Sequence, residues 1–156
     1  MESGVFTSIV VGTDGSAPAR EAVRVAAEMA RRDGAELHVV SAYRVFGDLL
    51  LVGGGGETTA AAGLEVETQI RGDVEAMLEG LAKELAAEGV AVTTHLSAER
   101  ATPAILDIAE RYEADLIVVG NRGARDPKVL GSVPQKVVHL APYSVLVVHT
   151  WPRRHP

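Results

Sequence analysis

Residues 7–18 read TSIVVGTDGSAP, a β-branched run followed at once by a turn and the start of a helix. The run 7–13 (TSIVVGT) is short and largely apolar, which is typical of a strand buried on both faces of a parallel sheet. The Asp-Gly-Ser of residues 14–16 ends this strand. Ser16 is a candidate N-cap, and Pro18 is tolerated in the first turn of a helix. This stretch therefore predicts the first β-α step of an α/β fold.

The rest of the chain repeats that alternation. Further strands are predicted at Leu37–Ala42, Val90–Leu96, Leu116–Val119 and Ser144–His149. Helices are predicted from Ser16 to Gly34, along Val74 to Gly89, from a Thr102 cap with Pro103 in the first turn, and from about Val133 to Leu140. Strict alternation implies right-handed crossovers, so we expect a single open, parallel, five-stranded sheet with helices on both faces.

We expect one domain over residues 1–156, without internal repeats. The segment Gly47–Gly63 contains four consecutive glycines and a run of small residues, and it is predicted to be a flexible loop. Such a loop serves either as a lid over a site or as a plain linker, and the sequence leaves both open. Residues 151–156 form a polar, proline-rich tail that we expect to fray.

Composition excludes several classes of function. The chain has no cysteine, which rules out disulfides and thiolate chemistry and agrees with a reducing compartment. Its net charge of −6 disfavours non-specific binding to nucleic acid or to anionic membranes. No apolar stretch approaches the roughly 20 residues of a membrane span, and residues 1–12 lack the basic start of a signal peptide. We therefore expect a cytoplasmic protein.

Candidate binding residues follow the predicted strands, because ligands of open α/β sheets bind beyond the carboxyl ends of the strands. After the first strand come Thr13 and Asp14. After the fourth come Gly120, Arg122 and Gly123, then Arg125 and Lys128, then Gly131-Ser132 at a helix start. A helix N-terminus with nearby cations attracts phosphate. Taken singly, the glycines could serve only as turns, and Ser132 or Asp14 only as helix caps.

The residues of known catalytic motifs are missing. No Gly-Lys-Ser/Thr follows a glycine loop, so there is no Walker A motif, and the GxGxxG spacing also fails. The five histidines show no metal-ligand spacing and are interpreted as structural or surface residues. We expect no fast catalytic chemistry.

The same residues resemble the universal stress protein family along nearly the whole chain. The matching stretches are 9–16 (IVVGTDGS), 114–120 (ADLIVVG), 131–133 (GSV), and 141–142 (AP) leading to 145–148 (VLVV). The resemblance implies strand order 3-2-1-4-5 and, often, a dimer. Members that bind ATP show the pattern G-x2-G-x9-G-S/T. Here Gly120, Gly123, Gly131 and Ser132 match, but residues 124–130 form a spacer two residues shorter than the family's nine.

The resemblance also implies roles for single residues. Thr13 and Asp14 would approach the adenosine, and the backbone around Ala42 would meet the adenine edge. Gly120, Gly123, Gly131, Ser132 and Val133, with Arg122 beside them, would hold ribose and phosphates. The expected ligand is ATP or another adenine nucleotide such as AMP or cyclic AMP, with Mg²⁺ carried by the phosphates rather than by a protein site.

The function expected from this similarity is that of a nucleotide-binding regulator in the stress response. Two alternatives stay open, a nucleotide-free protein-interaction module of the same fold and a slow ATPase. The last strand, 144–149 (SVLVVH), is apolar, lacks lysine and proline, and would lie at a sheet edge. Such an edge tends to pair with another strand, so we expect a homodimer through it.

Overall fold

The computed structural model describes residues 4–43, 57–121 and 128–150. These residues build a parallel five-stranded sheet of order β3-β2-β1-β4-β5. The strands are β1 (Ser8–Gly12), β2 (Glu36–Ala42), β3 (Ala91–Ser97), β4 (Leu116–Asn121) and β5 (Ser144–His149). The helices are α1 (Ala17–Asp33), α3 (Glu57–Ala87), α4 (Ala101–Arg111) and α5 (Ser132–Leu140). The predicted fold class and strand order are confirmed.

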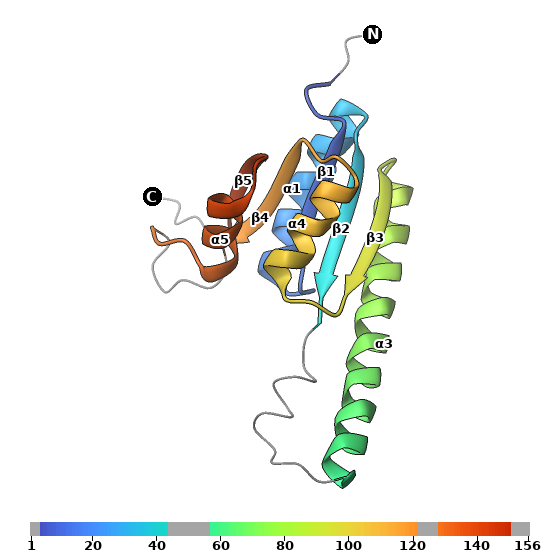
Figure 1. Cartoon of the computed structure of the whole chain (residues 1–156). Helices are drawn as coiled ribbons and strands as arrows, with labels where there is room; N and C mark the ends of the chain where they lie inside the picture. Colours follow the sequence, from blue (N-terminus) through green and yellow to red (C-terminus); the bar gives the residue numbers. More distant parts are fainter. Residues whose placement is uncertain (1–3, 44–56, 122–127, 151–156) are drawn as a thin grey trace, which may run out of the picture.

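Helices cover both faces of this sheet (Figure 1). Because side chains of a strand alternate, Ile9 and Val11 lie on one face and pack with α1 and α3, whereas Val10 lies on the other face with α4 and α5. Ile9, Val10 and Val11 are all fully buried. The continuous apolar run in β1 follows from its place in the middle of a sheet that is covered on both sides. None of the helices in the described ranges is long and apolar enough to cross a membrane.

The caps of α1 lie where the sequence predicts them. The hydroxyl of Ser16 accepts a hydrogen bond of 3.3 Å from the Ala19 N–H, and Pro18 lies in the first turn. At the other end Gly34 adopts φ = 68°, a left-handed conformation that glycine reaches without a Cβ penalty. Its N–H donates to the Ala30 carbonyl, which closes the last turn. The chain then turns directly into β2.

The prediction of a loop over Gly47–Gly63 is wrong at its C-terminal end. Helix α3 already begins at Glu57, so residues 57–63 are helical, while residues 44–56 lie outside the described part of the chain. Alanine is the best helix former, and residues 60–62 are three alanines in a row. The later turns of α3 pack on the sheet through Leu78 and Leu85, and the helix continues from them toward its N-terminus beyond the sheet (Figure 1).

Two other predicted boundaries also differ. Helix α4 begins at Ala101 with Arg100 as N-cap, and no side chain caps it, so Thr102 is a buried first-turn residue rather than the cap. Proline is accepted in the first turn, so Pro103 marks that turn without fixing its first residue. The third strand runs over Ala91–Ser97, one residue later than predicted. Neither shift changes the topology.

The strand order creates a switch point between β1 and β4. From β1 the chain moves through β2 to β3 on one side, then crosses back to β4 and β5 on the other. β1 and β4 pair directly, with Ile9 opposite Leu116 and Val11 opposite Val118. The loops that leave these two neighbouring strands diverge to opposite faces of the sheet, which leaves a crevice at their carboxyl ends.

Candidate functional site

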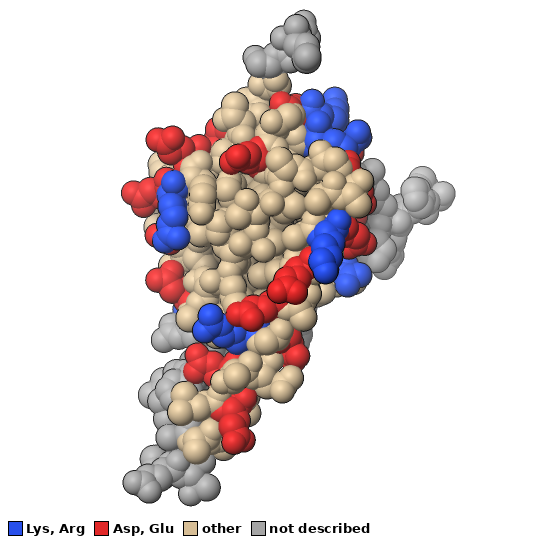
Figure 2. All heavy atoms as spheres, turned by 90° about the vertical axis from the view of Figure 1, so that its right-hand side faces the viewer, with Lys and Arg blue, Asp and Glu red and all other residues tan. Residues whose placement is uncertain are grey.

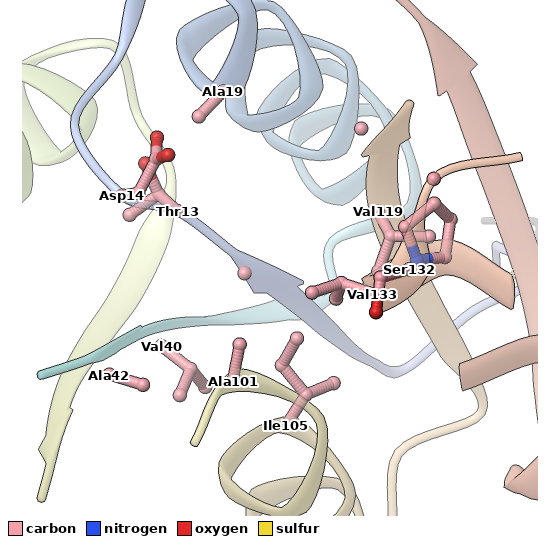
Figure 3. A pocket seen from close by; sticks show the side chains of 14 residues that line it. Thr13, Asp14, Ala19, Val40, Ala42, Ala101, Ile105, Val119, Ser132 and Val133 are labelled. Carbon is pink, nitrogen blue, oxygen red and sulfur yellow. The ribbon is translucent and has the colours of Figure 1, made fainter. Parts of the chain in front are cut away.

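A pocket of about 340 Å³ lies in this crevice, beyond the carboxyl ends of β1, β2 and β4 (Figure 3). That volume is at the lower end of the range for small-molecule sites, about 300 to 1,000 Å³. Seven of the predicted site residues line it, namely Thr13, Asp14, Ala42, Gly120, Gly131, Ser132 and Val133, whereas Lys128 does not. The structure thus brings together residues that lie more than a hundred positions apart in sequence.

One wall of the pocket is apolar. Val40 and Ala42 come from the end of β2, and Ala101 and Ile105 face them from α4 (Figure 3). Gly12 at the end of β1 leaves room for this wall, because a Cβ there would come 2.7 Å from the Ile105 Cδ1 atom. A side chain at position 12 would therefore displace the end of the Ile105 side chain from its place in this wall.

The β1–α1 turn forms the polar side of the pocket. The Thr13 N–H donates to the Val40 carbonyl at 2.8 Å, which ties the turn to β2. The Thr13 hydroxyl accepts from the Gly15 N–H at 3.1 Å, and Oδ1 of Asp14 accepts from the Ser16 N–H at 3.0 Å. These local bonds hold the Asp14 carboxylate at the pocket rim, where its side chain is exposed. Ser16, not Asp14, is the N-cap of α1.

The opposite side of the pocket is the N-terminus of α5. Gly131 is the N-cap, and Ser132 is the first helical residue, so Ser132 is not a cap. The first N–H groups of a helix have no carbonyl partner within the helix. Pro134 has no N–H at all, which leaves the Ser132 and Val133 N–H groups and the Ser132 hydroxyl as donors at this end. The positive end of the helix dipole adds to them and favours an anion.

The glycines around β4 differ in what they provide. A Cβ at Gly120 would lie 3.5 Å from Ala22 Cβ and from Thr150 Cγ2, an ordinary contact with α1 and with the end of β5. The backbone of Gly120 lines the pocket, whereas a Cβ at this position would point away from it, toward α1 and the end of β5. Arg122, Gly123 and Arg125 lie outside the described residues, and their predicted roles stay predictions. Lys128 is exposed.

Sequence reasoning missed half of the pocket wall. The additional lining residues are Gly12, Ala19, Val40, Ala101, Ile105, Val119 and Pro134. Most are apolar, and in a sequence they cannot be told from core residues. A signal existed for Val40 and Val119, because they lie near the ends of strands next to β1. Among the described residues no group of three or more His, Asp or Glu side chains could hold a metal ion.

An open α/β sheet with a pocket at its switch point defines a class of small-ligand-binding domains. The universal stress protein family model matches residues 6–149, and the chain belongs to this family. It is 37% identical to a universal stress protein of Thermus aquaticus over 92% of this chain and 99% of that one. It is also 34% identical to universal stress protein Rv1636 of Mycobacterium tuberculosis, over 93% of this chain and 97% of that one.

A solved structure extends the comparison to a bound ligand. A universal stress protein in complex with cAMP superposes with a TM-score of 0.69 at 27% identity, over 94% of this chain and 98% of that chain. The fold similarity therefore extends over nearly the full length of both chains.

Proposed function

We propose that the chain binds an adenine nucleotide in the switch-point pocket and acts as a nucleotide-dependent regulator in the stress response. The observation that carries this proposal is the pairing, within one pocket, of an apolar wall with the N-terminus of α5. An adenine ring is flat and apolar on its faces, whereas a phosphate is an anion. A nucleotide joins these two chemistries in one molecule, and the pocket has a place for each.

The apolar wall suits the base. Val40, Ala42 and Ile105 offer aliphatic surface on which an adenine ring can lie. The backbone around Ala42, at the end of β2, offers groups for the edge of the ring. The Asp14 carboxylate at the rim is an acceptor for a ribose hydroxyl or for the adenine amine.

The helix end suits the phosphates. The first turn of α5 carries three donors for a phosphate, namely the Ser132 and Val133 N–H groups and the Ser132 hydroxyl. Arg122 and Gly123 are proposed to add charge and close backbone approach from the preceding loop. Asp14 is the one carboxylate among the described lining residues, so a Mg²⁺ ion would be held by phosphate and water with little help from the protein.

The identity of the nucleotide is open within the adenine class. The spacer of residues 124–130 is shorter than in the ATP-binding pattern, which leaves less backbone for a triphosphate. The related protein solved with cAMP supports a cyclic or a single phosphate as an alternative to ATP. We therefore treat ATP, AMP and cyclic AMP as candidates to be ranked by measurement.

The proposal includes neither fast catalysis nor binding to nucleic acid or membrane. Fast hydrolysis needs a positioned general base or metal, and the described pocket residues supply only Asp14 as a titratable group. On the face seen in Figure 2, acidic and basic side chains are interspersed, without a continuous basic surface of the kind that binds nucleic acid. We propose a cytoplasmic location for the same protein.

Isothermal titration with ATP, ADP, AMP and cyclic AMP tests the proposal directly. We expect heat from at least one nucleotide at tens of micromolar protein, and weaker binding by Asp14→Ala. The matched control is Asp73→Ala, which removes an exposed carboxylate on α3 that does not line the pocket. Absence of heat with all four nucleotides would reject the proposal.

A second candidate function is that of a nucleotide-free interaction module. Val129, Leu130, Val138 and Leu140 are exposed apolar residues on α5 and on the segment before it, and such residues are frequent in protein interfaces. Absorbance near 260 nm in the gently purified protein distinguishes the two functions, because a carried-over nucleotide absorbs there and the protein alone absorbs little.

A further inference from the structure

The side chain of Asn121, the only asparagine of the chain, links the end of β4 to the residues just before α5. Its Nδ2 donates to the Val129 carbonyl at 3.0 Å, and its Oδ1 accepts from the Gly131 N–H at 2.8 Å. A carbonyl can only accept and a backbone N–H can only donate, so these partners fix the orientation of the amide. One side chain at the end of β4 therefore binds both residues that flank Leu130.

Asn121 is itself held firmly. It is fully buried, and it pairs in register with His149 of β5. Its backbone carbonyl also accepts a hydrogen bond of 3.3 Å from the Thr150 hydroxyl. The amide is thus attached to the sheet, and its hydrogen bond ties Gly131 to the end of β4. Leaving a buried amide without partners costs free energy, so the two side-chain bonds and the positions of Val129 and Gly131 stabilise each other.

The bond to Gly131 also decides what α5 offers to the pocket. Gly131 is the N-cap, and its N–H is occupied by Asn121. The Ser132 and Val133 N–H groups remain, and their direction depends on where Gly131 is held. A helix end displaced by about 1 Å would lengthen its hydrogen bonds to a ligand that is bound against the apolar wall, and would weaken them.

We propose that Asn121 is the positioning residue of the nucleotide site, which aims the first turn of α5 at the phosphate through its two hydrogen bonds to Val129 and Gly131. It does not touch the ligand, because it is not among the residues that line the pocket. This inference rests on the proposed function, since it assigns the residue a part in binding the same nucleotide.

Asn121→Asp separates positioning from simple structural damage. Ionised, the new carboxylate still accepts from Gly131 but repels the Val129 carbonyl, whereas the protonated acid again donates one hydrogen bond and accepts the other. Burial next to a carbonyl raises the pKa of a carboxyl group, so protonation falls in an accessible pH range. Cyclic AMP is the probe, because its phosphate keeps one constant negative charge over that range.

We expect Asn121→Asp to bind cyclic AMP about tenfold more weakly than the unmodified protein at about pH 8, and to approach its affinity at about pH 5.5. The matched control is Gln135→Glu, which makes the same amide-to-acid change on the exposed side of α5 and should show no such recovery. Equal affinities of Asn121→Asp and the unmodified protein at pH 8, or a ratio that stays constant with pH, would overturn the role.

A measurement on the unmodified protein covers the case in which Asn121→Asp does not fold. By amide hydrogen exchange, the Gly131 N–H should be strongly protected, and that of Ser132 should gain protection when cyclic AMP binds. Fast exchange at Gly131 would overturn the positioning role even if nucleotide binds. Protected exchange at Gly131 without binding of any nucleotide would instead reject the proposed function.

Discussion

Nδ1 of His38 lies 3.0 Å from Nε2 of His95, so two histidines from neighbouring strands share one hydrogen bond inside the fold. The His38 side chain is buried, and the Tyr112 ring stacks on it at a centroid distance of 4.2 Å. A hydrogen bond between two imidazoles needs one nitrogen that carries no proton. The fold therefore accommodates this pair best when at least one ring is neutral.

This pair predicts a loss of stability in acid. Burial, the neighbouring His38 and Arg111 lower the pKa of His95 to about 4, and burial lowers the pKa of His38 despite Glu36. Between about pH 6.5 and 4 the unfolded chain binds protons that the folded chain excludes, so the free energy of unfolding falls as pH falls through this window. Allowing for partial exposure of His95, we expect its share to be about 2 kcal/mol.

His95→Gln tests this expectation, because glutamine can hydrogen-bond to His38 but does not titrate. Urea unfolding at a series of pH values from about 8 to 4 should show a shallower loss of stability for this variant. His139→Gln, on the exposed surface of α5, is the matched control and should follow the unmodified protein. If His95→Gln and the unmodified protein lost stability in parallel, the pair would not be the cause.

We expect the effects of substitutions at Gly12 and Ile105 on stability to be coupled, because these two residues meet in the pocket wall. A methyl group at position 12 would meet the Ile105 Cδ1 atom at 2.7 Å, so Gly12→Ala should push this side chain and destabilise the fold by about 1 kcal/mol. Ile105→Val removes that atom. The double variant should therefore lose less stability than the sum of the two single variants, by about 1 kcal/mol. Simple additivity in urea unfolding would contradict the contact.

Gly120→Ala is the comparison for that pair. A Cβ at position 120 meets its neighbours at 3.5 Å, and we expect it to be accommodated with a smaller change in stability than at position 12. Nucleotide affinity should also fall more for Gly12→Ala than for Gly120→Ala. The substitution at position 12 displaces the Ile105 side chain, which lines the pocket.

The sequence predicted the fold well because its main signals are local. The apolar run of β1, the Ser16 cap and the Gly34 stop each depend on a few consecutive residues. The start of α3 was not predicted because a run of small, Ala-rich residues is compatible with both a loop and a helix. Whether it becomes helical depends on packing farther along the same helix, which the local sequence does not show.

The candidate site was predicted in part for a related reason. Thr13, Asp14 and Gly131 stand out because polar residues and glycines follow strands there, and a topological rule places such ends together. Ile105 looks like any other core residue of an amphipathic helix. His38 and His95 are 57 positions apart, and only the pairing of β2 with β3 brings them into contact.

Gly123→Val should abolish nucleotide binding without unfolding the protein. This prediction comes from the sequence pattern, since residue 123 lies outside the described part of the chain. A branched side chain would occupy the space where backbone must approach a phosphate. Titration with ATP and cyclic AMP, together with a thermal unfolding curve, measures both parts of the prediction. Unchanged affinity would show that this loop is not part of the site.

The edge strand β5 predicts a homodimer. β5 is the outermost strand next to β4, as expected, and its residues 145–148 are only half buried. An apolar edge with free backbone groups is stabilised by pairing with a second copy across a two-fold axis. Val147→Lys introduces a charge at the centre of that edge, and it should shift the sedimentation of the protein toward that of a monomer.

A control is needed because Val147 also packs against the core on the side of α4 and α5. Val5→Lys places the same charge at a side chain that is 82% exposed in the segment before β1, so it should leave sedimentation unchanged. Thermal unfolding of Val147→Lys shows whether the variant is folded, and a folded monomer supports pairing through the edge. The sedimentation of the unmodified protein can contradict the prediction. If the unmodified protein sediments as a monomer at high concentration, β5 is stable as a half-buried edge strand and no second copy covers it.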